Sequence, residues 1–153
     1  MAGLEPEFEL KTPPGDDRER RVCATCGFVD YVNPRIVAGA VVESADGQIL
    51  MCKRAIEPRK GFWTLPAGFM EQGESVADAA RREAREEACA TLELTDLLAV
   101  YSIPRISQVQ MFYRARLADP AIAPGPESLE VALYHWDEIP FDDLAFPSVR
   151  WAL

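Results

Sequence analysis

The chain has 153 residues, of which 48% are hydrophobic, and a formal net charge of −9. This length suffices for one compact domain with a buried core, and the acidic balance argues against a general nucleic-acid binder, which needs basic groups to displace counterions. Because His135 is the only histidine, multi-histidine metal sites are excluded.

The start of the chain predicts the cellular compartment of the protein. The segment MAGLEPEFEL lacks the basic and apolar regions of a signal peptide, and no apolar run is long enough to span a membrane. We therefore expect a cytoplasmic protein with no membrane partner, whose four cysteines are thiols or metal ligands and not a disulfide framework. An acidic protein that acts on phosphates most readily recruits a divalent cation to bridge the two negative partners.

Residues 1–21 are polar and rich in turn formers, with a charged run that we expect to be solvated. Cys23 and Cys26 follow in a Cys-x-x-Cys-Gly pattern. Two cysteines at this spacing supply half of a zinc ribbon, whereas a structural zinc needs four ligands. We therefore expect residues 1–34 to form an N-terminal extension without bound zinc, and residues 35–153 to form the main domain.

The main domain alternates predicted strands around one long helix. Apolar and β-branched residues predict strands in five segments, which are 35–44, 48–54, 92–103, 108–117 and 130–136. A second helix is expected to begin at Pro147, and the Trp-Thr-Leu-Pro-Ala-Gly segment at 63–68 is expected to be a loop. Strands before and after one helix predict an α+β fold, in which the helix packs on a mixed sheet.

The long helix is predicted within GFMEQGESVADAARREAREEACA, residues 68–90. Ser75 followed by Asp78 resembles a capping box, so the helix should begin near Val76. At about 100° per residue, one face collects mainly small residues, which are Val76, Ala77, Ala80 and Ala84. Small side chains allow the helix axis to lie close to the sheet.

Three glutamates, Glu83, Glu86 and Glu87, fall on the border of that face. Glu83 and Glu87 are a like-charge pair at i,i+4, which costs an isolated helix roughly 0.2–0.5 kcal/mol. On one interpretation, neighbouring arginines compensate this charge and the helix is an ordinary solvated surface. On the other, a carbonyl of the preceding loop, at Gly68, completes an all-oxygen cage with the carboxylates, suited to Mg²⁺ or Mn²⁺.

The spacing of these residues carries a family resemblance. Five residues separate Gly68 from Glu74, seven precede the pair Arg82-Glu83, and two precede Glu86-Glu87. This pattern resembles the signature of the Nudix hydrolases, and the Trp-Thr-Leu-Pro-Ala-Gly before it is similar to the usual lead-in of that family. The resemblance covers residues 35–147 and implies the Nudix fold, a mixed β-sheet packed between helices as an α/β/α sandwich.

Further segments look like a subgroup described as ADP-ribose/FAD pyrophosphatases; they are Asn33-Pro34-Arg35, Cys52-Lys53-Arg54, Gly125-Pro126-Glu127-Ser128-Leu129-Glu130 and Ile139-Pro140-Phe141-Asp142. This resemblance implies hydrolysis, dependent on Mg²⁺ or Mn²⁺, of the diphosphate bond in a small-molecule nucleotide, ADP-ribose or FAD, with release of AMP. The string that marks NADH-cleaving relatives is absent, and Pro104 lies where ADP-ribose-cleaving relatives carry a proline. Relatives are commonly dimers, which leaves a homodimer open.

The resemblance also implies roles for individual residues. The metal ligands would be Gly68, Glu83, Glu86 and Glu87, and Arg82 would hold a catalytic glutamate in place. Family enzymes often place one more carboxylate near the metals, for which we favour Glu130 because it begins a predicted strand. The substrate-binding residues would be Arg54 and Glu127.

Cys89 and Ala90 depart from the family pattern, which has a glycine and a larger aliphatic residue there. The glycine would end the helix in a left-handed conformation, which costs a residue with a Cβ roughly 1 kcal/mol. We therefore expect a helix end at Cys89 that is either strained or closed differently with ordinary backbone angles, and we favour strain. Two other functions stay open: a non-catalytic nucleotide sensor with the same fold, and a zinc-ribbon adaptor, which the missing ligands and the acidic charge disfavour.

Overall fold

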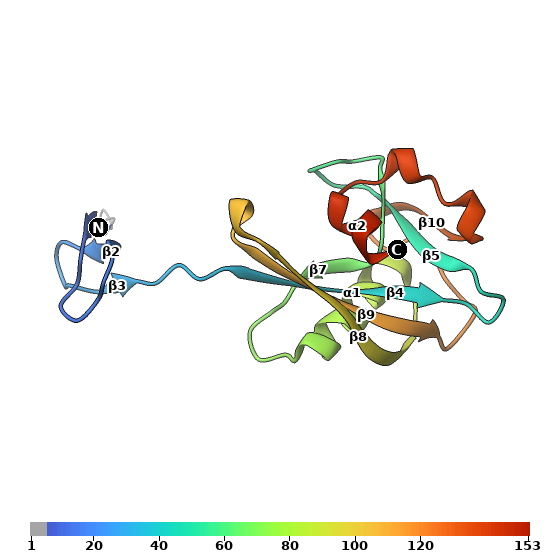
Figure 1. Cartoon of the computed structure of the whole chain (residues 1–153), viewed down its shortest axis with the longest axis horizontal. Coiled ribbons are helices and arrows are strands. Elements are labelled where there is room, and N and C mark those ends of the chain that lie inside the picture. Colours follow the sequence, from blue (N-terminus) through green and yellow to red (C-terminus); the bar gives the residue numbers. More distant parts are fainter. Residues whose placement is uncertain (1–5) are drawn as a thin grey trace, which may run out of the picture. The chain divides into compact units, whose positions relative to one another are not determined.

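The computed structural model describes residues 6–153. Relatives with a zinc ribbon carry an earlier cysteine pair at positions that correspond roughly to Met1 and Leu4, and these lie outside the described residues. The chain divides into two compact units, Met1–Pro34 and Arg35–Leu153 (Figure 1). Within residues 6–153, no helix is long and apolar enough to cross a membrane.

The first unit contains a three-stranded antiparallel sheet of β1 (Phe8–Lys11), β2 (Arg20–Cys23) and β3 (Val29–Asp30), in that order. The charged run of residues 16–21 is mostly exposed, as predicted, whereas strands β1 and β2 were not predicted. Val22 and Cys23 are buried at the end of β2, and this local burial supports strands whose other residues are mostly polar. The Cys-x-x-Cys turn closes with hydrogen bonds from Cys23 N–H to Phe28 O and from Gly27 N–H to Cys23 O.

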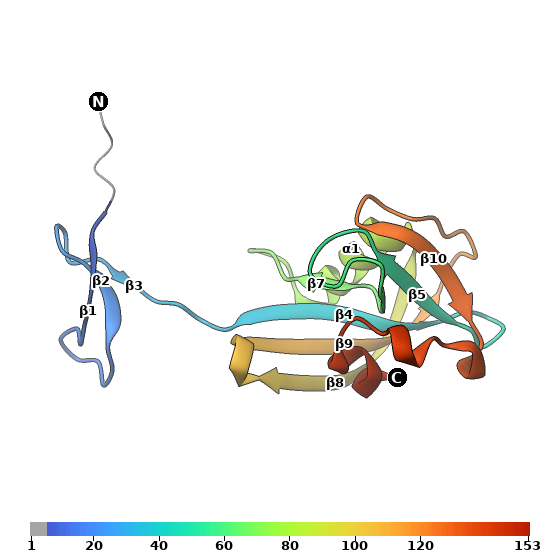
Figure 2. The ribbon, with the colours of Figure 1, turned by 90° about the horizontal axis from the view of Figure 1, so that it is seen from above.

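The second unit contains a seven-stranded mixed sheet (Figure 2). Its strands are β4 (Arg35–Glu43), β5 (Ile49–Arg54), β6 (Trp63–Thr64), β7 (Ala67–Phe69), β8 (Leu92–Ile103), β9 (Gln108–Leu117) and β10 (Ser128–Tyr134). The order is β10-β5-β4-β9-β8, with β6 paired to β5 and β7 paired to β4. Only the β4–β9 pair is parallel among those described. The predicted loop at 63–68 therefore includes two short strands.

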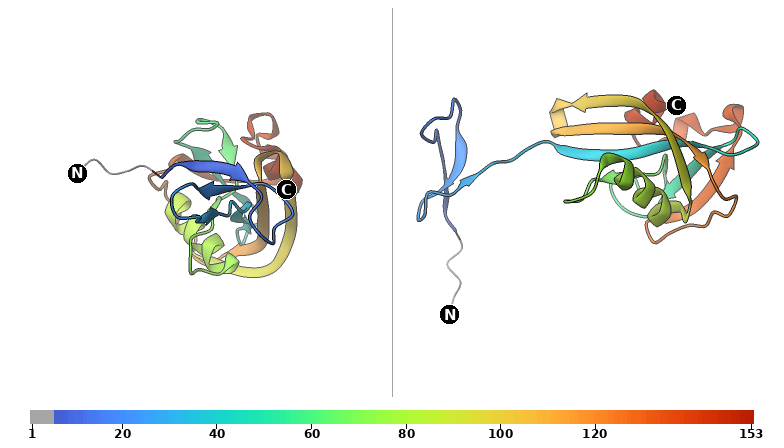
Figure 3. Two further views of the ribbon diagram at one scale, coloured as in Figure 1. Left: turned by 90° about the vertical axis from the view of Figure 1, so that its left-hand side faces the viewer. Right: turned by 90° about the horizontal axis from the view of Figure 1, so that it is seen from below.

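The remaining elements of this unit are helical. They are α1 (Val76–Ala88), α2 (Pro147–Ala152) and the 3₁₀ turns η1 (Pro104–Ile106), η2 (Trp136–Glu138) and η3 (Phe141–Asp143). Two of the views show α1 and α2 on opposite faces of the sheet (Figures 2 and 3). The predicted α/β/α arrangement of the Nudix fold is confirmed.

Alternation along the central strands builds a separate core on each face, because successive strand residues point to opposite sides. Toward α1, the core contains Ala40, Val42, Leu50 and Cys52 with Ala84 and Ala88 of the helix. Toward α2, it contains Met51, Trp63, Leu65 and Phe112 with Val149 and Ala152. Leu50 and Cys52 lie in the core toward α1, and Met51 between them lies in the core toward α2. This alternation is expected of a strand that is buried on both faces.

The face of α1 that packs on the sheet consists of alanines. Ala79, Ala80, Ala84 and Ala88 are fully buried, so the predicted face is correct at Ala80 and Ala84 and is completed by two further alanines. These small side chains let the helix axis approach β4, which contributes Ala38 to the same cluster. The glutamates beside this face are thereby brought against the sheet.

Candidate active site

The loop before α1 lies directly against one of its glutamates. β7 pairs with β4, with Gly68 opposite Ala38, which fixes the backbone of the loop on the sheet. A Cβ placed on Gly68 would overlap the Glu83 carboxylate. Only a residue without a side chain therefore allows this approach of backbone to carboxylate, which is the arrangement that a shared oxygen site requires.

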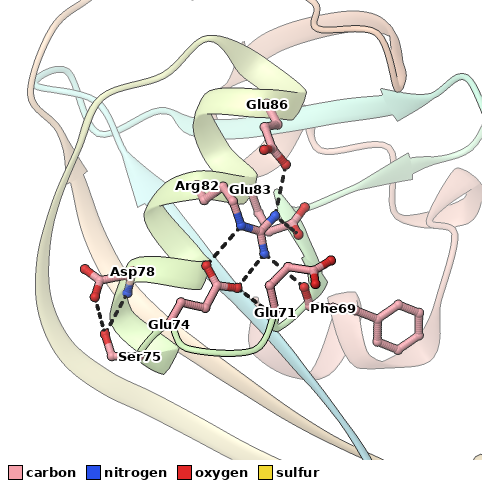
Figure 4. Close-up of polar contacts among 8 residues, drawn as sticks. All are labelled: Phe69, Glu71, Glu74, Ser75, Asp78, Arg82, Glu83 and Glu86. Atoms are coloured by element: carbon pink, nitrogen blue, oxygen red, sulfur yellow. Dashed lines mark hydrogen bonds and ion pairs between the residues drawn. The ribbon is translucent and has the colours of Figure 1, made fainter.

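Arg82 is the centre of the hydrogen-bond network on α1 (Figure 4). Its Nε and Nη2 donate to the two carboxylate oxygens of Glu74 at 3.1 and 2.7 Å, and its Nη1 donates to Glu83 at 2.6 Å and to Glu86 at 2.9 Å. Nη2 also donates to the carbonyl oxygen of Phe69 at 2.9 Å, which ties the helix to the preceding loop. One planar guanidinium thus orients three carboxylates and a carbonyl.

The hydrogen bonds and charge of Arg82 strongly lower the pKa of Glu74. Hydrogen bonding to Arg82 lowers the pKa of Glu74 to about 2, helped by the backbone N–H of Glu71. The pKa of Arg82 is raised, mainly by the same bond to Glu74 and against its own burial. Glu74 and Arg82 are therefore a permanent ion pair, which anchors the loop between β7 and α1.

Glu87 has no cationic hydrogen-bond partner in the part of the chain that the structure describes. Its side chain is only 5% exposed, and it accepts one hydrogen bond, from the backbone N–H of Ala67 at 3.1 Å. Burial raises its pKa to about 8; the bond from Ala67 and the charge of Arg54 oppose this shift, while the charges of Glu83 and Glu127 add to it. An ionised carboxylate at this position needs a nearby positive charge.

Opposing effects act on the pKa of Glu83. Burial raises its pKa, the hydrogen bond and charge of Arg82 lower it, and the charges of Glu86 and Glu127 raise it again. Four carboxylates, those of Glu83, Glu86, Glu87 and Glu127, thus form one acidic cluster in which one arginine binds two members.

The donor atoms of this cluster are of the kind that a divalent cation prefers. Oxygen donors of this kind suit Mg²⁺ or Mn²⁺, and the backbone of Gly68 lies beside the Glu83 carboxylate. Across residues 6–153, no three acidic, cysteine or histidine side chains converge in metal-binding geometry as they stand. The residues therefore fit a divalent cation by their chemistry, with Glu83 and Glu86 also bonded to Arg82.

The loop before β10 closes the C-terminal end of α1. Ala123 N–H donates to Ala88 O and Gly125 N–H donates to Glu87 O, both at 3.0 Å, so the last carbonyls of the helix are satisfied. A Cβ on Gly125 would overlap the carbonyl oxygen of Glu86, which requires glycine here. Gly125 begins one of the segments that carry the subgroup resemblance, and its position between two prolines is typical of a tight loop. This docking carries Glu127 toward the cluster.

The two candidate carboxylates of this segment have different surroundings. Glu127 acts on both Glu83 and Glu87 through its charge. Glu130 instead forms an ion pair with Lys53, its register partner on β5, at 3.5 Å. The charge of Glu127 therefore acts on the cluster, whereas the carboxylate of Glu130 is engaged by Lys53.

Arg54, the predicted phosphate contact, ends β5. Its Nε donates to Pro58 O at 2.8 Å, and its guanidinium lies 5.1 Å from the ring centre of Phe146. Its charge lowers the pKa of Glu87. It therefore lies close enough to the acidic cluster to act on a group bound there.

Both ends of α1 agree with expectation. Ser75 is the N-cap and its Oγ accepts a hydrogen bond from Asp78 N–H at 3.1 Å, so the predicted start at Val76 is confirmed. Cys89 has φ 51° and ψ 23°, which is the left-handed conformation, and the predicted strained end is confirmed. Ala90 N–H donates to Ala84 O at 3.1 Å, and Ala90 itself is buried in the core, so the helix closes as a glycine would close it.

Two family models match this chain, and their matches correspond to its two compact units. The family model described as NUDIX domain matches residues 33–152, and the model described as Nudix N-terminal, a zinc ribbon, matches residues 6–32. Within residues 6–32, Cys23 and Cys26 are the only cysteines and there is no histidine. The absence of bound zinc stays a prediction.

Individual proteins are similar over different lengths. A solved NUDIX hydrolase from Nitrosomonas europaea is 45% identical with a TM-score of 0.92, over 99% of this chain and 86% of that one. An ADP-ribose pyrophosphatase from Methanocaldococcus jannaschii is 40% identical over 74 residues, 48% of this chain and 43% of that protein. The NAD-capped RNA hydrolase NudC from Stutzerimonas stutzeri is 30% identical over 119 residues, 77% of this chain and 42% of that protein. The chain spans less than half the length of both of these curated relatives.

Proposed function

The chain belongs to the Nudix family, and on this premise we propose that it hydrolyses the diphosphate bond of nucleoside diphosphate derivatives with the help of a divalent cation. ADP-ribose is the substrate that we favour, with AMP and ribose 5-phosphate as products. The name of the M. jannaschii relative supports this choice, as does Pro104 of this chain.

One observation carries the proposal, which is the state of Glu87. This carboxylate is buried, accepts only the Ala67 N–H, and lies among three other carboxylates that act on it or on its neighbour Glu83. Such a cluster is stable in its ionised form only with a compensating positive charge. Glu83, Glu86, Glu87 and the Gly68 carbonyl would hold a divalent cation, which would supply that charge and the Lewis acidity needed to bind a diphosphate and activate water.

The side chains of the protein divide the remaining tasks. Arg82 orients Glu83 and Glu86, and the Ala67 N–H orients Glu87, so the ligands are held before the substrate arrives. Arg54 offers a cation to a phosphate oxygen on the side of the cluster near Phe146. Hydrolysis adds water across the P–O–P bond, and Glu127, a member of the cluster with no ion pair among the described residues, is suited to accept the proton.

The test is a parallel assay of ADP-ribose, FAD, NADH and a nucleoside triphosphate, each with Mg²⁺, with Mn²⁺ and with a chelator. We expect the highest kcat/KM for ADP-ribose, release of AMP, and loss of turnover with the chelator. A different preferred compound would change the substrate while keeping the reaction. Binding of nucleotides without any turnover would overturn the proposal in favour of a nucleotide sensor.

A further inference from the structure

A pocket of about 330 Å³ lies beside the last helix of the chain. Arg59 contributes to it from the loop after β5, and the segment that leads through η3 into α2 supplies the rest of the wall. The residues of that segment which matter here are Phe141, Asp142, Phe146, Arg150 and Trp151. The proposed reaction uses none of these side chains.

The two arginines of the pocket are held by backbone carbonyls. Arg59 Nε donates to Ala145 O at 3.1 Å, and its guanidinium lies 4.2 Å from the ring centre of Phe62. Arg150 Nη2 donates to Phe141 O at 2.6 Å, and its guanidinium lies 5.3 Å from the ring centre of the same phenylalanine. A carbonyl and a ring orient a guanidinium without cancelling its charge.

The positive charges of Arg59 and Arg150 contrast with the acidic composition of the chain. Neither Arg59 nor Arg150 forms an ion pair with any of residues 6–153, although the formal net charge is −9. Asp142 is the one acidic residue of the lining, and it has no ion pair within that range either. Arg59 also has φ 65°, a conformation that costs a non-glycine residue free energy. The loop therefore holds a cation in a strained position, with no carboxylate of residues 6–153 at ion-pair distance.

Phe146 connects this pocket to the acidic cluster. Its ring lines the pocket, and it also lies 5.1 Å from the guanidinium of Arg54. Arg54 is the register partner of Ser128, and the N–H of the next residue, Ala55, donates to Glu127 O at 2.8 Å, so this arginine lies beside the segment that carries Glu127. A substrate bound at the cluster would therefore reach Arg59 and Arg150 along Arg54 and Phe146.

We propose that this pocket binds a phosphate group that the substrate carries in addition to its scissile diphosphate. Guanidinium groups offer paired N–H donors that match phosphate oxygens. Small-molecule sites span roughly 300–1,000 Å³, so the volume suits a phosphorylated sugar or a terminal phosphate better than a whole dinucleotide. The extra phosphate belongs either to the ribose of the nucleotide or to a nucleoside triphosphate. This inference rests on the proposed function for the position of the scissile bond.

The first experiment measures binding without turnover. Calorimetry without divalent cations would compare 5′-AMP with adenosine 2′,5′-bisphosphate, which differ by one phosphate. We expect the bisphosphate to bind about tenfold or more tightly than AMP, and Arg59→Gln or Arg150→Gln to abolish most of this advantage. Arg150→Lys, which keeps the charge, should retain part of it. Because Arg59 and Arg150 lie in different segments, a folding defect in one variant leaves the other as a test.

The control is Arg105→Gln, which removes the same charge from an exposed position in η1. We expect this variant to bind both compounds like the unmodified protein. Equal binding of AMP and the bisphosphate by the unmodified protein would overturn the proposal. An equal loss in Arg105→Gln would also overturn it, because the effect would then come from net charge.

The second experiment identifies the source of the phosphate. It compares kcat/KM for ADP-ribose and ADP-ribose 2′-phosphate, and separately for ADP and ATP, with Mg²⁺. A preference for the first phosphorylated compound assigns the pocket to a ribose phosphate, and a preference for ATP assigns it to a terminal phosphate. Hydrolysis of these compounds with neither preference would overturn the pocket proposal. A binding advantage for the bisphosphate without hydrolysis of any compound would reject the proposed reaction and keep the pocket.

Discussion

The acidic cluster beside α1 and the arginine pocket beside α2 hold their charges in opposite ways. At α1, one arginine binds Glu74, Glu83 and Glu86, and Glu87 is left to a single backbone N–H. At α2, Arg59 and Arg150 rest on carbonyl oxygens and aromatic rings. Pairing with an opposite charge cancels part of the charge of a side chain, whereas a neutral dipole orients a side chain and leaves its charge for a ligand.

This difference separates the residues of α1 by role. Glu74 and Arg82 neutralise each other and hold the loop between β7 and α1. Glu87 is oriented by Ala67 but not neutralised, which makes it the carboxylate most dependent on a cation. The predictions below test that separation.

The largest effect is expected for Glu87→Gln. Removing the charge while keeping the shape should lower kcat by about a hundredfold to a thousandfold, because the cation loses a ligand where charge develops. Without metal, the melting temperature at pH 7 should not fall, since burial disfavours the ionised carboxylate and a neutral amide avoids that cost. The measurements are turnover of ADP-ribose with saturating Mg²⁺ and thermal unfolding with a chelator.

Glu93→Gln on β8 makes the same change at an exposed position and should leave both quantities unchanged. Near-full activity of Glu87→Gln at saturating Mg²⁺ would show that α1 is not the metal site.

Arg82→Lys should lower kcat/KM by roughly tenfold to a hundredfold, as is usual when a group that orients metal ligands is altered. Lysine keeps the charge but cannot donate from a planar fork to Glu74, Glu83 and Glu86 at once. Arg81→Lys is the matched control, because the Arg81–Asp78 pair is exposed and touches none of these glutamates. Equal kinetics of the two variants would argue that Arg82 has no positioning role.

Glu74→Gln should change how the stability of the folded protein depends on pH. Arg82 lowers the pKa of Glu74 from 4.5 to about 2, so the ionised form stabilises the folded state above pH 4.5 and this contribution is lost as the pH falls toward 2. The melting temperature of the unmodified protein should therefore fall more steeply across this range than that of Glu74→Gln. Unfolding scans at several pH values measure the two slopes, and parallel slopes would contradict the assigned pair.

The smallest effect is expected at Cys89. Its φ of 51° strains a residue with a Cβ, so Cys89→Gly should stabilise the protein by about 0.5–1 kcal/mol, or a few degrees in melting temperature. Cys89→Ala removes the thiol but keeps the Cβ, and its stability should stay near that of the unmodified protein. The Mg²⁺ dependence should be unchanged in both. A destabilised Cys89→Gly with unchanged metal affinity would reject the strain.

Short-range features of α1 could be predicted because they depend on neighbouring residues. The cap at Ser75, the left-handed end at Cys89 and the border position of the three glutamates all follow from helical geometry and backbone sterics. The strand-and-helix order of the main domain was predictable for the same reason. The strands of the first unit were missed, because within residues 6–34 only Pro13, Val22 and Cys23 are buried, and so few buried residues do not distinguish a polar strand from a loop.

The sequence by itself thus determined the family pattern, the helix and the set of acidic residues proposed to hold a cation. Only the tertiary structure decided which of them is buried without a cationic hydrogen-bond partner among residues 6–153, because Glu87 meets Ala67 and the Gly125 loop from distant parts of the chain. The same holds for Glu127 beside the cluster, Glu130 paired with Lys53, and the two arginines that meet around one pocket. Burial and the sum of nearby charges set the chemistry of an ionisable group, and both arise only when separate segments pack together.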